Sequence, residues 1–228
     1  MRRPLRTLST VLIIAGAMML GDAALTVAWQ EPVSALYAQI VQGQLGDDLH
    51  RLELAEPGAV DLAALRSLAT ERERMAFLAR ALRRKSKRGA AVGRIRIARI
   101  GENAVVVDGT DTASLRKGPG IYDDAPFPGA PGTVAIAGHR TTYLAPFRHI
   151  DRLRPGNLIV LEMPYGRFTY RVQQTRIVDP SQVSVVKRVG YDRLVLTACH
   201  PLYSAAKRIV AFARLMSVEA RGAARVRG

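Results

Sequence analysis

Cys199, the only cysteine in the chain, stands where a predicted strand gives way to a loop. The apolar run 194–196 before it is typical of a short buried strand, and Pro201 cannot continue a central strand because it lacks a backbone N–H. Loops at strand ends commonly present binding and catalytic residues. The thiol is therefore a candidate nucleophile.

His139 and Arg208 stand at the edges of two other predicted strands. His139 follows the apolar run 133–138, and Arg208 opens the run 209–215, which is placed to pair with the strand of Cys199. A thiol, an imidazole and a guanidinium are the groups that a cysteine acyl-transfer site requires. These residue types predict such a site.

The chemistry follows from the properties of thiols. An ordinary cysteine, with a pKa of ~8.5, is only a few per cent thiolate near neutral pH, so it needs a base or a positive neighbour, which His139 supplies. The thiolate would attack a peptide carbonyl, Arg208 would stabilise the oxyanion, and the imidazolium would protonate the departing amine. The product is a thioester, and an incoming amine then takes the acyl group, which is transpeptidation.

A structural interpretation competes with the catalytic one at each of these residue types. A lone cysteine in a barrel is usually a small buried hydrophobe, and an isolated histidine at a strand end usually has a satisfied structural role. We assign His50 and His149 the structural role and leave the role of His200 open.

The region from Gly93 onward must position these side chains. Short apolar or alternating runs, separated by turns rich in Gly, Pro and Asn, predict about eight strands and few helices over residues 93–220. That pattern predicts a mainly β fold, a closed antiparallel or mixed barrel with short helices. Residues 221–228 form a basic tail.

Residues 31–92 have a helical pattern. Apolar residues recur at helical spacing, and Glu56-Pro57-Gly58 is predicted to divide the segment into two helices, with Asp61 close to the start of the second. We interpret the segment as a juxtamembrane stalk and assign it no catalytic role. The basic run 83–88 is interpreted as a solvated linker end, with attraction to anionic lipid head groups as the alternative.

The first thirty residues predict a location. Arg2, Arg3 and Arg6 precede the apolar run 8–29, whose only formal charge is Asp22 and whose length is close to the ~20 residues that span a bilayer. We expect a single-pass transmembrane signal-anchor over residues 1–30. The arginines before it predict a cytoplasmic N-terminus and an extracytoplasmic catalytic domain at the cell membrane. A cleaved signal peptide is the rival interpretation.

Composition narrows the partners. The chain has 228 residues and a net charge of +15, which favours an anionic surface nearby. No signature of a nucleic-acid-binding fold occurs, so we expect a membrane and no nucleic acid. The single cysteine excludes an intramolecular disulfide. No phosphate loop, metal motif or cofactor motif is visible, and we expect no cofactor, while a calcium site made of separate carboxylates stays open.

Two segments resemble a known family. Leu196-Thr197-Ala198-Cys199-His200-Pro201, with Arg208 behind it, resembles the signature of the sortases. The segment Gly138-His139-Arg140, ahead of Tyr143-Leu144-Ala145-Pro146-Phe147, is similar to the sortase histidine segment. The resemblance runs from about Gly93 to Val218. Ala198, where many members carry a second Thr, and His200 look closest to the actinobacterial class E sortases.

The resemblance implies a fold, a reaction and partners. A sortase is a β-barrel transpeptidase that uses Cys199, His139 and Arg208 in the roles given above, and Thr197, Ala198 and Tyr143 would line its peptide groove. Its substrate would be a secreted protein with a C-terminal sorting signal of the Leu-Pro-x-Thr-Gly or Leu-Ala-x-Thr-Gly kind, cut between Thr and Gly. The acceptor would be an amine of a peptidoglycan precursor in the cell wall of a Gram-positive bacterium.

Three alternatives compete with the interpretation as a sortase that anchors proteins to the cell wall. A pilin-polymerising sortase would be expected to carry an aromatic lid motif before the barrel, and none is present. A cysteine L,D-transpeptidase would carry a Ser-His-Gly-Cys type motif, which is also absent. A membrane-tethered, non-catalytic barrel that binds a partner and carries an inert thiol fits the anchor, stalk and barrel equally well.

Overall fold

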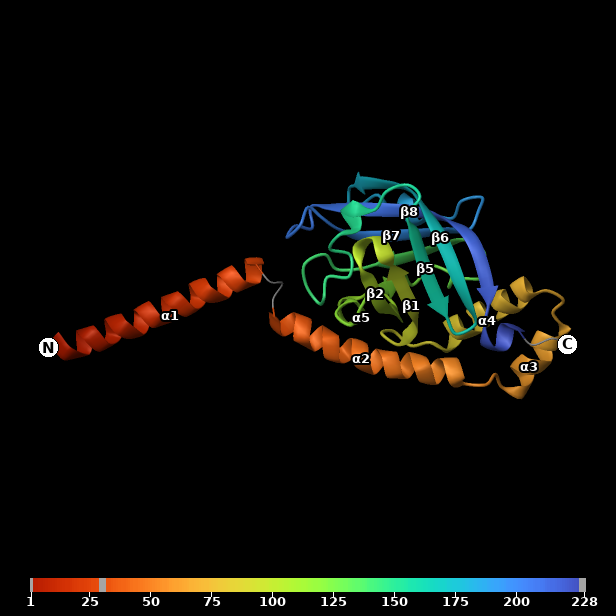
Figure 1. Ribbon diagram of the computed structural model, residues 1–228, viewed down its shortest axis with the longest axis horizontal. Coiled ribbons are helices and arrows are strands. Elements are labelled where there is room, and N and C mark those ends of the chain that lie inside the picture. The colour runs from red at the N-terminus through yellow and green to blue at the C-terminus, as the bar shows by residue number, and fades with distance from the viewer. Residues whose placement is uncertain (1, 29–31, 226–228) are drawn as a thin grey trace.

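The computed structural model describes residues 2–28 and 32–225. Four helices come first along the chain, and a β-barrel follows them (Figure 1). Helix α1 spans Arg2–Ala28, α2 Pro32–Leu54, α3 Ala59–Ser67 and α4 Glu71–Lys85. Helix α1 projects away from the rest, α2 runs along the barrel, and α3 and α4 lie at the end where the chain finishes.

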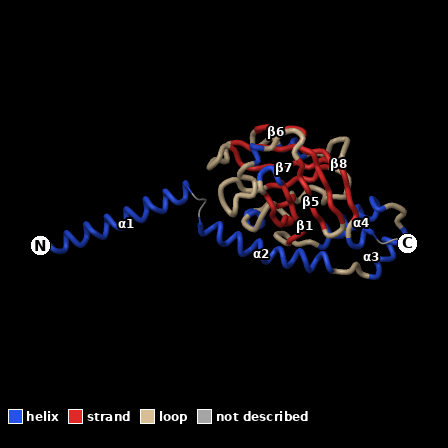
Figure 2. The backbone as a smooth tube through the Cα atoms, viewed as in Figure 1, coloured by secondary structure: helices blue, strands red, loops and turns tan. Residues whose placement is uncertain are grey.

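After these helices the chain forms a closed barrel of eight strands, which confirms the predicted barrel (Figure 2). The strands follow one another around it in the order β1-β2-β3-β4-β7-β8-β6-β5. Strand β2 pairs in parallel with β3, and β4 with β7, while the other pairs are antiparallel. The barrel is therefore mixed. The strands are β1 Ala91–Ile97, β2 Glu102–Asp108, β3 Gly120–Ile121, β4 Thr133–Ala137, β5 Leu158–Met163, β6 Gly166–Val178, β7 Arg193–His200 and β8 Lys207–Ala220.

Short helical turns connect the strands. Helix α5 spans Thr112–Leu115, and four 3₁₀ turns in the described chain cover Ala98–Ile100, Ile150–Arg152, Val183–Val186 and Gly222–Arg225.

The inside of the barrel is filled by alternate residues of each strand. On β7, Leu194, Leu196 and Ala198 belong to the main core cluster, and their neighbours on β8 contribute Ile209 and Ala211. Because successive side chains of a strand point to opposite faces, the odd-numbered residues of β7 lie on the outer face. Cys199 is one of them.

Helices α2 and α4 pack on the barrel. Leu45 and Leu49 of α2 share a buried cluster with Val105 and Val107 of β2. On α4, Arg83 forms an ion pair with Asp108 at the end of β2. These contacts make α2 and α4 part of the same folded body as the barrel.

The helical region divides into three helices after the first, one more break than predicted. The break at 55–58 was expected from Glu56-Pro57-Gly58, but α3 ends at Ser67 and α4 starts afresh at Glu71. Thr70 caps α4 through a capping box, in which its side chain accepts from the Glu73 N–H and the Glu73 carboxylate accepts from the Thr70 N–H. The charged run 71–74 is thus a helix start.

The sequence predicted a transmembrane span over residues 1–30. Across residues 2–28 and 32–225, no helix combines the length and the apolar character that crossing a bilayer demands. The structure therefore does not support that part of the predicted fold.

We expect Gly138→Ala to destabilise the barrel at the end that carries His139. A Cβ at Gly138 would lie 2.6 Å from Cδ2 of the buried Phe147 ring, so the ring or the strand end must shift. Overpacking of this kind costs about 1–3 kcal/mol. Gly190→Ala is the matched control, because nothing lies within 4 Å of its added Cβ. Denaturant unfolding measures both, and equal stabilities would contradict the packing argument.

Candidate active site

Strand pairing brings the three predicted catalytic residues to one end of the barrel. A single row of paired residues crosses five strands, running through Val107, Gly120, Ala137, Thr197 and Val210. His139 stands two residues after Ala137, and Cys199 stands two residues after Thr197. Arg208 stands two residues before Val210, on a strand that runs antiparallel to that of Cys199. All three therefore extend beyond this row in the same direction.

Cys199 and Arg208 face each other directly. They are Cα partners in the antiparallel pairing of β7 with β8, so their side chains leave the sheet on the same face. Both are half-buried. The guanidinium does not bond to the thiol in this structure. Its Nη1 donates instead to the carbonyl of Ala205, at 2.8 Å, in the turn before β8, and to that of Lys207, at 3.0 Å, the first residue of β8.

His139 flanks Cys199 from the other side. Strand β4 pairs in parallel with β7 up to Ala137, and the Gly138 N–H continues the ladder by donating to the Thr197 carbonyl at 3.1 Å. The next residue, His139, follows the direction of this register toward Cys199. Thiol and guanidinium thus stand on paired strands, β7 and β8, and the imidazole stands two residues beyond the end of β4, the other neighbour of β7. Neighbouring strands lie roughly 5 Å apart.

The environment of His139 favours the neutral imidazole. Its Nε2 is buried and has no hydrogen-bond partner among the described residues. Burial lowers the pKa of His139 below its ordinary value of 6.5, and the positive charge of Arg116 lowers this pKa further. A neutral imidazole is able to accept a proton, which is the state that a base for the Cys199 thiol needs.

Tyr143 lies against His139 and is held there by an unusual backbone. The two ring centroids are 5.3 Å apart. Three consecutive residues, Tyr143, Leu144 and Ala145, have positive φ angles of 50°, 63° and 42°. Each costs about 1–2 kcal/mol for a residue with a side chain. Arg116 stacks over the same tyrosine ring at 5.9 Å.

A hollow of about 300 Å³ adjoins the thiol. It lies between Cys199, the β7–β8 loop at Pro201 and 203–205, and Arg140 with Thr141. A second open space, a cleft lined by Tyr143, lies at the same end of the barrel. An extended peptide that presents a carbonyl to the sulfur has room to enter here.

The predicted groove residues occupy different environments. Thr197 is buried on the outer face, where its hydroxyl and that of Tyr122 share a hydrogen bond of 2.9 Å. Ala198 is 3% exposed and packs in the barrel core, so its side chain does not face the hollow beside Cys199. Tyr143 does line an open cleft.

Sequence reasoning missed the role of Arg140. This guanidinium is 4% exposed, and its Nη1 lies 3.4 Å from the Cys199 carbonyl and 3.2 Å from Nδ1 of His200. Its Nη2 donates to Asp151 at 2.9 Å and to the Arg148 carbonyl at 3.1 Å. Because arginine only donates, Nδ1 of His200 must accept, which fixes the tautomer of His200 with its proton on Nε2. A side chain buried after a strand-end glycine gives no periodic signal in the sequence.

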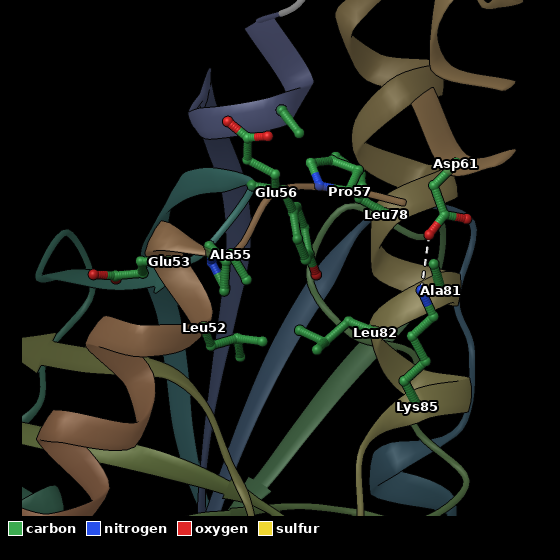
Figure 3. A pocket seen from close by; sticks show the side chains of 13 residues that line it. Leu52, Glu53, Ala55, Glu56, Pro57, Asp61, Leu78, Ala81, Leu82 and Lys85 are labelled. Carbon is green, nitrogen blue, oxygen red and sulfur yellow. Dashed lines mark hydrogen bonds and ion pairs between the residues drawn. The ribbon is translucent and has the colours of Figure 1, made fainter. Parts of the chain in front are cut away.

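Another hollow, of about 140 Å³, lies between α2, α3, α4 and the turn of β5 with β6 (Figure 3). Leu52, Leu78 and Leu82 point into it, and the ion pair of Asp61 with Lys85 stands at its edge. The pairing of β6 with β8 places this turn beside Ala220 and Val178 beside Arg208, so the hollow is at the far end of the barrel. It holds none of the predicted catalytic groups.

Among the residues that the structure describes, no three His, Cys, Asp or Glu side chains are grouped in a way that would hold a metal ion.

A family model described as the sortase domain matches residues 95–216, more than half of the chain. The chain belongs to the sortase family. Sortase D of Bacillus subtilis is 36% identical to it over 118 residues, which cover 51% of this chain and 58% of that protein. Sortase SrtE1 of Streptomyces coelicolor is 32% identical over 94 residues, covering 37% and 27%. This sortase thus matches less than two thirds of the length of these curated relatives.

Solved sortase structures share the barrel. Sortase E of Streptomyces avermitilis aligns with a TM-score of 0.54 and 33% identity, over 59% of this chain and 93% of that one. Sortase E1 of Streptomyces coelicolor, solved with a tripeptide in the active site, aligns with a TM-score of 0.55 and 26% identity, over 58% and 91%. The predicted family and barrel are confirmed, with type D and type E relatives both similar to this sortase.

Arg116→Gln should raise the pKa of His139 toward its ordinary value, because one of the two causes that lower it disappears. The folded state favours neutral His139, so this contribution to stability is present above about pH 6.5 and is lost as the pH falls. The variant should reduce that loss. Titration of the His139 ring by NMR measures the shift, with Arg66→Gln on α3 as the control. An unchanged pKa would contradict the assigned cause.

Arg140→Lys should destabilise the site end of the barrel by about 1–3 kcal/mol, because one ammonium cannot replace the fork of contacts to Cys199, His200 and Asp151. Urea unfolding measures the loss. The rate of iodoacetamide alkylation of Cys199 should also change, since the carbonyl of that residue loses its partner. Arg152→Lys, an exposed change in the same loop, is the control and should alter neither quantity.

Proposed function

We propose that this sortase is a cysteine transpeptidase, with Cys199 as nucleophile, His139 as proton carrier and Arg208 as oxyanion donor. One observation carries the proposal. In the register of β4, β7 and β8, all three residues stand two positions beyond the paired row of Ala137, Thr197 and Val210, in the same direction. Strand β7, which carries the thiol, lies between the other two strands.

Acylation begins with a proton transfer. The neutral imidazole of His139 takes the thiol proton of Cys199, and the thiolate attacks the carbonyl carbon of a bound peptide. The oxyanion that forms is stabilised by Arg208, whose guanidinium exchanges a carbonyl of its own turn for the charged oxygen. When the C–N bond breaks, the imidazolium protonates the leaving amine, and a thioester on Cys199 remains.

Deacylation reverses the proton movements. A neutral acceptor amine attacks the thioester carbonyl, its proton passes to the imidazole of His139, and the C–S bond breaks to release the Cys199 thiolate. An amide bond joins the two substrates. The proton on His139 then returns to the thiolate, so the free enzyme is restored.

The substrates in this proposal are those that the family resemblance implies. The donor is a secreted protein with a C-terminal sorting signal of the Leu-Pro-x-Thr-Gly or Leu-Ala-x-Thr-Gly kind, cut between Thr and Gly. The acceptor is an amine of a peptidoglycan precursor. The donor peptide lies in the hollow lined by Cys199, Thr141 and the β7–β8 loop. Of the predicted groove residues, Tyr143 lines a separate cleft at the same end of the barrel. We place the reaction outside the cytoplasmic membrane of a Gram-positive bacterium, a location that rests on the N-terminal charge pattern.

Cys199→Ala should abolish cleavage of a fluorogenic sorting peptide, and Arg208→Lys should slow it by about 10²–10³-fold, because an oxyanion donor in fixed geometry is lost. Intact-mass spectrometry of the wild type should show an acyl adduct on Cys199. Arg214→Lys, an exposed change on the same strand, is the control. Normal cleavage by Cys199→Ala would exclude Cys199 as the nucleophile. Absence of both cleavage and an adduct with any sorting peptide would leave a barrel that binds a partner without chemistry.

A further inference from the structure

A cleft of about 250 Å³ opens beside Tyr143, and it shares no lining residue with the hollow at Cys199. Its walls come from four places in the chain: α2, the turn of β1 with β2, residues 117–119, and the loop after His139. Gln42, Glu102, Lys117, Tyr143 and Leu144 line it.

The cleft lies at the catalytic end of the barrel. Strand β2 starts at Glu102, and the row of paired residues that runs to Thr197 crosses β2 at Val107. Because β3 runs parallel to β2 and antiparallel to β4, the start of β2 and the end of β4 lie at the same end. The Tyr143 ring forms a wall of the cleft and is 5.3 Å from the His139 ring.

Helix α2 completes this cleft and fixes its wall. The Gln42 side chain donates to the carbonyls of Val105, at 3.1 Å, and Lys117, at 2.7 Å, and accepts from the Val105 N–H at 2.7 Å. At the start of α2, Tyr37 packs edge-on against Tyr143 at 6.4 Å. The helix therefore joins both sides of the cleft, although it lies outside the family match at 95–216.

Glu102 gives the cleft its chemistry. It is the one acidic residue among those that line the cleft in the described chain, and no ion pair with it occurs there. Burial raises the pKa of Glu102 to about 7. Lys117 lines the same cleft, but its Nζ lies 3.3 Å from the Gly89 carbonyl. A carboxyl group that has lost water and has no cation gains most from a cationic ligand.

We propose that this cleft binds the amine acceptor of the transfer reaction, with Glu102 as the carboxylate that binds its cationic group. The inference rests on the proposed function and names a binding site for the second substrate. The donor occupies the hollow between Cys199 and the β7–β8 loop, so the acceptor has to arrive from another side. The Glu102 carboxylate takes the first proton of the bound ammonium, and the neutral amine attacks the thioester and passes its second proton to His139. Tyr143, a wall of this cleft, has its ring 5.3 Å from the His139 ring.

Glu102→Gln tests the site, because the amide keeps the shape of the side chain and removes the charge. The probe is triglycine amide, a short peptide with one protonated amine. We expect its KM as acceptor to rise about tenfold or more, which corresponds to the loss of a charge-assisted hydrogen bond. Hydrolysis of the sorting peptide without acceptor, and its reaction with hydroxylamine, should stay within about twofold of the wild type, since neither nucleophile is a cation at neutral pH.

Glu219→Gln is the matched control, because it removes an exposed carboxylate on β8 at the far end of the barrel. An equal KM for triglycine amide in Glu102→Gln and wild type would overturn the cleft proposal while leaving the proposed function intact. A missing acyl adduct on Cys199 would instead overturn the proposed function.

Direct binding tests the cleft independently of turnover. Triglycine amide titrated into the Cys199→Ala protein should shift NMR signals of the Tyr143 loop. Adding Glu102→Gln to that protein should weaken the binding about tenfold, and adding Glu219→Gln should not. Absence of binding to Cys199→Ala, or equal binding by both double variants, would overturn the proposal.

Discussion

The pairing of β7 with its two neighbours is the constraint on which the site depends. The parallel partner β4 delivers His139 from one side, and the antiparallel partner β8 delivers Arg208 from the other. Since a shift of one residue in a strand turns each side chain to the opposite face, the same register that fills the core with Leu194 and Leu196 sets Cys199 outside it. Core packing and the geometry of the site are therefore one property of the fold.

This coupling explains why so much of the site followed from the sequence. The three candidate residues each stand at the end of an apolar run, and apolar runs are the strongest signal of buried strands. Because successive side chains of a strand point to opposite faces, Ala198 packs inside the barrel while Thr197 and Cys199 lie on its outer face. Strict use of this alternation excludes Ala198 from the predicted groove. Partner choice among strands, by contrast, follows from long-range packing that no local pattern encodes.

The parts that sequence reasoning missed depend on contacts between distant segments. Arg140 is buried because Asp151 and the carbonyls of Arg148 and Cys199 surround it, and these come from two separate stretches of chain, 148–151 and the end of β7. Gln42 likewise matches a backbone N–H and carbonyl of β2 that only the folded barrel presents. Thr70 is different, since a Thr followed three residues later by Glu is a local helix-start signal that was available in the sequence.

The helices before the barrel change how the catalytic end has to be understood. A family match that begins at 95 describes the strands that carry thiol, imidazole and guanidinium, and it leaves out α2. Yet Leu45 and Leu49 bury this helix on β1 and β2, and that burial holds Gln42 against Val105 and Lys117 and Tyr37 against Tyr143. Because three residues of that loop have positive φ angles, their conformation needs support from packing around them. Helix α2 supplies such support on the face away from Cys199, so a barrel cut free of it would keep the catalytic row and lose a wall of the cleft beside it.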